Sequence, residues 1–263
     1  MVLLINILLM FGTGIIAGFF GGLLGIGGAS IMIPALTLVF LLPIHLAVAI
    51  SLVNNVAVSL TSAIRYNQQK MVHKGIVTTL IAGSIFGILI GTVIATRSPE
   101  SAIKILFGIF LLVMVLIAFI PRKGDRSEKT PDEIHATKKP GLVIVGFIMG
   151  VLGAILGIGG GMVAVPSLND FFHLPLKNSI ANSLATIVVA SSLGAIIYFY
   201  LGAGTVFSLH DALATAIVLI PGSVIGANLG TLALKYLSTK HIKYIFYALL
   251  LYMAYNLIVS GLS

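Results

Sequence analysis

Long stretches of this chain carry no charged residue at all. Residues 1–64 contain no Lys, Arg, Asp or Glu, and neither do residues 75–96, 105–121, 141–169, 178–209, 212–234 and 244–263. A helix that spans a membrane needs about 20 apolar residues with few or no charges. Only 8% of the residues are charged, whereas a soluble domain carries roughly 25%. The sequence therefore predicts an all-α polytopic protein of the plasma (inner) membrane, since the alternation expected of an outer-membrane barrel is missing.

Several other classes of protein and site are disfavoured by the same sequence. The chain has no Cys and therefore no disulfide framework or thiolate metal site. Its net charge of +8 comes from basic residues in short loops between apolar segments, which predicts lipid headgroups rather than nucleic acid as their partner. The six histidines lie near segment ends, where surface or interfacial positions are expected. We expect no catalytic residues, no metal and no cofactor, and Met1–Phe20 lacks the positive start of a signal peptide, so we expect it to be retained.

The second half of the chain repeats the first. Leu24-Gly25-Ile26-Gly27-Gly28-Ala29 recurs 132 residues later as Leu156-Gly157-Ile158-Gly159-Gly160-Gly161, and Pro34 and Ser51 recur at the same offset as Pro166 and Ser183. Further on, Gly83, Gly87 and Gly91 match Gly222, Gly226 and Gly230. We therefore divide the chain into a first membrane repeat (1–121), a charged cytoplasmic linker (122–140) and a second membrane repeat (141–263).

Each repeat is predicted to contain five helical segments. In the first repeat they cover residues 2–22, 29–42, 45–65, 75–96 and 101–121, and in the second 141–157, 161–173, 177–201, 209–234 and 241–261. The first two segments form a hairpin that begins and ends on one side of the membrane, whether its Gly-rich turn reaches the far surface or stops midway. Three further crossings then leave each repeat with an odd number, which predicts that the two repeats are inverted relative to one another.

The distribution of basic residues favours this inverted arrangement. It places 13 of the 15 Lys and Arg residues on one side and only Arg97 and Lys104 on the other, whereas parallel repeats of four crossings would give a split of 9 against 6. Basic residues accumulate in cytoplasmic loops. The sequence thus predicts that both termini lie outside and that the linker is cytoplasmic.

The Gly-rich turns are candidate binding sites for an anion. Within a bilayer, a broken helix is tolerated only where protein or a water-filled cavity supplies hydrogen-bond partners. The first turn of the next helix presents unpaired amides and the positive end of the helix dipole, which together attract anions. In transporters with inverted repeats, matched helix breaks indicate the substrate site, and we expect the two Gly-rich hairpins to meet near the midplane. The candidate residues in these turns are Gly25, Gly27, Gly28, Ala29, Ser30, Gly157, Gly159, Gly160 and Gly161. Gly83, Gly87, Gly91 and their counterparts are instead predicted to permit close helix packing.

The third segment of each repeat adds polar side chains. Polar residues are expensive inside a membrane unless they face protein, water or substrate. The candidates are Ser51, Asn54 and Asn55 in the first repeat, and Asn182, Ser183 and Thr186 in the second. Ser59 and Ser62 extend the stripe of Ser51 and Asn55 along one helical face. These side chains could complete an anion site or connect helices, and the sequence leaves both roles open.

The doubled motif also carries a family resemblance. Gly21–Gly28 leading to Pro34-Ala35-Leu36, repeated as Gly153–Gly161 leading to Pro166-Ser167-Leu168, resembles the signature of the sulfite exporter TauE/SafE family over essentially the whole chain. The resemblance implies export of a small anion, such as sulfite or an organosulfonate. A permease for another small solute is the alternative, and the sequence leaves a homo-oligomer open.

Overall fold

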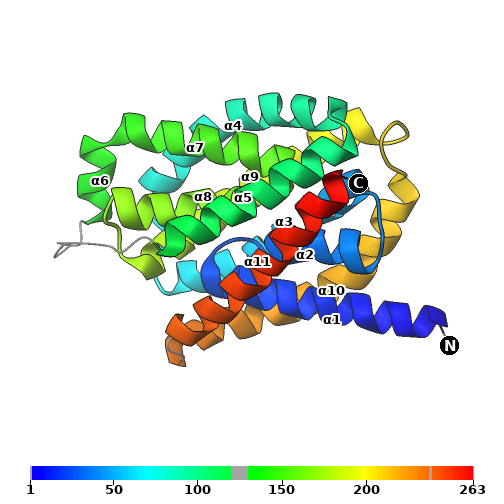
Figure 1. The fold of residues 1–263 in the computed structure, drawn as a ribbon. Coiled ribbons are helices and arrows are strands. Elements are labelled where there is room, and N and C mark those ends of the chain that lie inside the picture. The colour runs from blue at the N-terminus through cyan, green and yellow to red at the C-terminus, as the bar shows by residue number, and fades with distance from the viewer. Residues whose placement is uncertain (1, 120–129, 237–238, 263) are drawn as a thin grey trace.

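The computed structural model describes residues 2–119, 130–236 and 239–262, and every regular element in them is a helix (Figure 1). The ten predicted segments are confirmed within three residues at each end. In chain order the helices are α1 (Val2–Leu24), α2 (Ala29–Pro34), α3 (Ile44–Gln68), α4 (Lys74–Arg97), α5 (Glu100–Phe119), α6 (Pro131–Thr137), α7 (Lys139–Ile155), α8 (Gly161–Pro166), α9 (Leu176–Gly202), α10 (Leu209–Tyr236) and α11 (Thr239–Leu262).

Seven of the described helices are long and apolar enough to cross a membrane: α1, α3, α4, α5, α9, α10 and α11. The eighth long helix, α7, has 17 residues. Helix α6 was not predicted, and it lies in the range that we assigned to the solvated linker. It begins with a capping box between Thr130 and Glu133, and it buries Ile134 completely in a small apolar cluster. The charged residues at 122–129 lie outside the described part of the chain.

Both Gly-rich turns interrupt the chain and start a new short helix. Helices α2 and α8 each continue, directly after their proline, as a π-helical turn, Ala35–Val39 and Ser167–Phe171. Pro34 and Pro166 have no N–H to donate and crowd the preceding turn, so the helix widens where the regular ladder is broken. The duplicated proline thus explains the duplicated π-turn.

The turns stop halfway along the neighbouring long helices. Asn55, near the middle of α3, has its amide oxygen 2.9 Å from the position that a Cβ on Gly27 would occupy. Ser191, near the middle of α9, has its hydroxyl 2.6 Å from the equivalent position on Gly159. The sequence left the depth of the turns open, and the structure places both at the mid-height of the helices beside them.

Helices α1 to α5 of the first repeat correspond in order to α7 to α11 of the second. The helix pairs that join the two repeats follow the same correspondence. Helix α1 packs along α10 at one edge of the molecule, and α4 packs along α7 at the opposite edge (Figure 1). The central helices α3 and α9 contact each other, as do α5 and α11. The two repeats are therefore interleaved rather than separate bodies.

The glycines spaced four residues apart make this packing close, as predicted. A Cβ at Gly83, Gly87 or Gly91 would overlap α7 backbone at Val143, Phe147 or Val151, and Gly222, Gly226 and Gly230 meet α1 in the same way. The order of these contacts shows that α4 runs parallel to α7 and that α10 runs parallel to α1.

We expect Gly87→Leu to destabilise the protein, because its side chain would have to force α4 and α7 apart. Overpacking of this kind costs about 1–3 kcal/mol. The measurement is thermal unfolding in detergent, with Gly12→Leu as the matched control, since a Cβ at Gly12 meets nothing within 4 Å. Equal melting temperatures for the two variants would contradict the role of Gly87 in packing.

Candidate functional site

The first tip, defined as residues 25–28, has a backbone that other residues rarely adopt. Gly25, Gly27 and Gly28 have φ values of +78°, +79° and +92°. Glycine enters this region at little cost, whereas a side chain would strain it. Gly21, on the last turn of α1, packs against the tip, because a Cβ at Gly21 would lie 2.6 Å from the amide nitrogen of Gly28. The tip is therefore folded back onto the end of α1.

The second tip, residues 157–160, has the same conformation. Gly157, Gly159 and Gly160 have φ values of +67°, +66° and +80°. Gly153 supports this tip as Gly21 supports the first, with its Cβ position 2.8 Å from the nitrogen of Gly160. The sequence repeat thus corresponds to a repeated backbone shape, glycine by glycine.

The first tip contacts Gly161, which directly follows the second tip and begins α8. A Cβ on Gly161 would lie 2.5 Å from the carbonyl oxygen of Gly25 and 2.7 Å from the Cα of Ile26. We call this contact, with the side chains around it, the junction. The two Gly-rich turns therefore meet in the structure, and their position near the membrane midplane stays a prediction.

Side chains from the opposite repeat hold the carbonyl groups of the tips. The Ser183 hydroxyl on α9 donates to the carbonyl of Gly25 (2.9 Å), and the Asn55 amide on α3 donates to that of Gly157 (3.0 Å). Each central helix thus binds the tip of the other repeat. These contacts fix the tips through their acceptors and leave their donors for another partner.

The amides that begin α2 and α8 lack such a partner. Within the described residues, no hydrogen bond involves the backbone N–H of Gly27, Gly28, Ala29 or Ser30, and the same holds for Gly159, Gly160, Gly161 and Met162. Buried backbone amides are nearly always paired in native proteins. Two groups of four unpaired donors therefore lie at the junction.

Unpaired polar side chains also occur at the start of α2 and along the central helices α3 and α9. Ser30, Ser51, Asn54, Asn55, Ser59, Ser62 and Ser191 are completely buried. Within the described structure, the hydroxyls of these serines, both amide atoms of Asn54 and the amide oxygen of Asn55 have no hydrogen-bond partner. Each such group costs about 1–3 kcal/mol of stability, so a cluster of them indicates a place where a ligand or water supplies the missing bonds.

Two predicted site residues are engaged elsewhere. The Asn182 oxygen accepts from the backbone N–H of His73 (2.8 Å), and its amide donates to the carbonyls of Asn178 (2.7 Å) and Met71 (3.4 Å). Thr186 donates to the carbonyl of Asn182 (2.8 Å). Asn182 therefore connects α9 to the loop between α3 and α4, and it has little capacity left for a ligand.

Ser191 was missed in the sequence, although a signal for it was present. The offset of 132 residues that relates the two tips also maps Ser59 onto Ser191. In the structure the Ser191 hydroxyl lies beside Gly159, as described above, and it belongs to the unpaired cluster.

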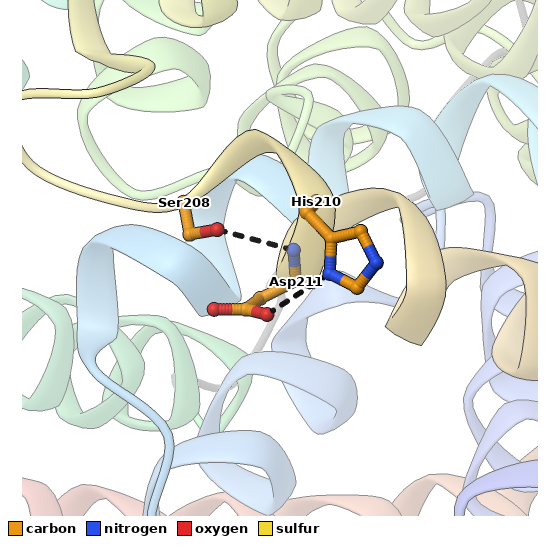
Figure 2. Close-up of polar contacts among 3 residues, drawn as sticks. All are labelled: Ser208, His210 and Asp211. Atoms are coloured by element: carbon orange, nitrogen blue, oxygen red, sulfur yellow. Dashed lines mark hydrogen bonds and ion pairs between the residues drawn. The ribbon is translucent and has the colours of Figure 1, made fainter.

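The expectation for the histidines is wrong for His45. Its side chain is only 4% exposed. The Tyr198 hydroxyl lies 2.9 Å from Nδ1 of His45, and the Ser98 carbonyl oxygen lies 3.2 Å from Nε2. A neutral ring with its hydrogen on Nε2 satisfies both contacts. His210 behaves as expected: Figure 2 shows it at the start of α10 beside Asp211, with Nδ1 3.4 Å from Oδ1, and both side chains are exposed.

Two cavities lie beside the Gly-rich turns. A cavity of about 110 Å³ with mostly apolar walls reaches the tips at Ile26 and Met162, and a space of about 10 Å³ lies beside Gly159. The smaller space holds at most about one water molecule. No group of three or more His, Cys, Asp or Glu residues gathers anywhere in the described ranges.

Comparison with known proteins gives a consistent result. The probable membrane transporter protein MamO of Paramagnetospirillum magneticum is 27% identical over 93% of this chain, and the match covers only 43% of that relative. The probable membrane transporter protein YunE of Bacillus subtilis is 26% identical over 95% of this chain and 96% of its own length. No solved structure matches the chain significantly.

A match at the level of the family covers nearly the whole chain. The sequence model of the sulfite exporter TauE/SafE family matches residues 10–257, which include both tips, both central helices and the helices that pack around them. The chain therefore belongs to the sulfite exporter TauE/SafE family of membrane transporters.

Proposed function

We propose that this transporter carries a small oxyanion, a sulfur oxyanion such as sulfite or an organosulfonate, and binds it at the junction of the two tips. The observation that supports this most strongly is the set of unpaired amides that begins α2 and α8. Amides at helix starts bind anions without a charged side chain. The unpaired hydroxyls of Ser30, Ser51 and Ser191 would add further donors.

The chemistry of the junction favours an anion over a cation. Most of its free groups are amide and hydroxyl donors, beside one free acceptor, the amide oxygen of Asn55, and the helices that follow the tips begin there with the positive ends of their dipoles. No carboxylate is among the buried polar side chains of the described residues. A divalent metal cation binds oxygen ligands that usually include carboxylates.

Rocking of one repeat against the other would give the anion access from alternate sides. The parallel packing of α1 with α10 and of α4 with α7 supports the inverted arrangement. In the predicted topology α1 and α4 run in opposite directions relative to the membrane, so their parallel partners do so too. The inverted repeats, the outside termini and the cytoplasmic linker are all part of this proposal.

The membrane potential alone would drive efflux of a monoanion. A potential of about 100 mV, negative inside, is worth about 2.3 kcal/mol per elementary charge. At equilibrium this corresponds to a gradient of about fiftyfold.

The proposal is tested by flux into sealed vesicles that contain the purified protein. We expect sulfite influx that rises when the vesicle interior is made positive and falls when it is made negative, with no uptake of sodium. Uptake of a cation or a neutral solute in place of sulfite would favour the alternative, a permease for another small solute.

A further inference from the structure

The polar face of α3 continues beyond the junction and ends at a charge. Ser51, Asn55, Ser59 and Ser62 follow one another along this face, and Arg65 lies on it one turn further on. The hydroxyls of Ser59 and Ser62 are completely buried and have no partner in the described structure. The unpaired hydroxyls of Ser51, Ser59 and Ser62 thus follow this face toward Arg65.

The other repeat has no such line. The positions in α9 equivalent to Asn55, Ser62 and Arg65 are Ile187, Gly194 and Ile197. Of the donors beyond the junction, only Ser59 has a polar counterpart, Ser191. Because only α3 carries these residues, they are not part of the structure that both repeats share. The asymmetry indicates a role on one side of the membrane.

The guanidinium of Arg65 lies against protein and has no counter-ion among the residues that the structure describes. It is half-buried, and Nη1 donates to the backbone carbonyl of Asn228 on α10 (3.3 Å). Gly22 of α1 lies close to both Ser62 and α10, because a Cβ at Gly22 would lie 3.0 Å from the Ser62 hydroxyl and 2.7 Å from the carbonyl oxygen of Ala227. Within the described residues, no carboxylate lies within ion-pair distance of Arg65. A partly desolvated cation without a partner is costly.

We infer that Arg65, together with Ser59 and Ser62, forms a second anion subsite between the tips and the end of the molecule where α3 ends. The inference rests on the proposed function, and it assigns a role in capture to a residue outside the junction. A guanidinium presents a planar set of donors that matches an oxyanion. An anion that meets Arg65 would exchange water for the guanidinium, and then for the two hydroxyls, before it reaches the tips.

An arginine near a helix end also anchors a helix by extending its charge to the lipid headgroups. Such an anchor directs its guanidinium outward. Arg65 instead donates to a carbonyl of the adjacent helix and shares a face with the buried hydroxyls. Arg97 is exposed at the end of α4. It therefore serves as the matched control, an arginine that only anchors its helix.

The absence of Cys from the chain allows a direct test by charge rescue. Arg65→Cys is reconstituted into vesicles, and sulfite flux is measured before and after a thiol reagent attaches either an aminoethyl or a sulfonatoethyl group. We expect the unmodified variant to raise KM for sulfite about tenfold or more, with kcat within about twofold. The aminoethyl group should restore most of the affinity, and the sulfonatoethyl group should lower it further. Arg65→Lys should act like the aminoethyl adduct, and Arg97→Cys should behave like the unchanged protein.

The possible results separate this inference from the proposed function. An unchanged KM in Arg65→Cys, or the same effect of both attached groups, would overturn the subsite while leaving the junction in place. A fall in kcat without a change in KM, not restored by Arg65→Lys, would assign Arg65 a structural role and overturn the subsite as well. If the unchanged protein moves no sulfite, the proposed function and the subsite both fail.

Discussion

Gly159→Leu is expected to abolish anion flux while the protein still inserts into the membrane. Gly159 has a φ of +66°, and a Cβ there would lie 2.6 Å from the Ser191 hydroxyl, 2.8 Å from Cγ2 of Ile187 and 3.2 Å from the Asn55 amide nitrogen. A leucine would thus enter the centre of the junction and occupy the space in front of the unpaired amides. Sulfite flux in vesicles, normalised to the amount of inserted protein, is the measurement.

The matched control for this prediction is Gly12→Leu, because it places the same side chain on a long helix where a Cβ meets nothing within 4 Å. We expect its flux to equal that of the unchanged protein. Gly27→Leu should match Gly159→Leu, since Gly27 is the equivalent residue of the first tip and its Cβ position is 2.9 Å from the Asn55 oxygen. Retained flux in both tip variants would remove the junction as the transport site.

The helices and the tips could be predicted because their causes are local. Charge-free segments define the long helices, and repeated glycines such as Gly27 and Gly159 mark a backbone that only glycine adopts easily. The packing role of Gly87 and Gly226 also followed from their spacing. Each of these features depends on a few neighbouring residues, and each one occurs in both repeats of the sequence.

The partners of individual polar side chains could not be predicted, because they come from distant parts of the chain. Asn182 binds the loop that contains His73, and His45 is buried against Tyr198 and Ser98. Ser183 binds the carbonyl of Gly25, but the equivalent contact to Gly157 comes from Asn55 rather than from Ser51, the counterpart of Ser183. The repeat predicts equivalent backbones, whereas each side-chain contact depends on how the two repeats meet.

The adjacent residues Asn54 and Asn55 are expected to give opposite effects on stability and the same loss of transport. Asn54 is completely buried, and neither its amide nitrogen nor its amide oxygen has a partner in the described structure. Leucine has nearly the same shape and removes two unpaired polar atoms, so Asn54→Leu should raise the free energy of unfolding by about 1–3 kcal/mol. If the amide of Asn54 serves the anion, the same change should reduce flux at least tenfold. Gains in stability at the expense of activity are typical of residues kept for function.

Asn55→Leu removes a contact that the folded protein uses. The Asn55 amide donates to the carbonyl of Gly157, and its loss leaves that carbonyl unpaired at the second tip, at a cost of about 1–3 kcal/mol. We expect this variant to lose both flux and thermal stability in detergent. Lower stability of Asn54→Leu, or full flux in either variant, would contradict the assignment of these asparagines to the anion site. The sequence left two roles open for such residues, a connection between helices or a part of the anion site. A group that only connects helices stabilises the protein, whereas a group held for a substrate destabilises it until the substrate is bound. The contrast between the two variants therefore separates these roles.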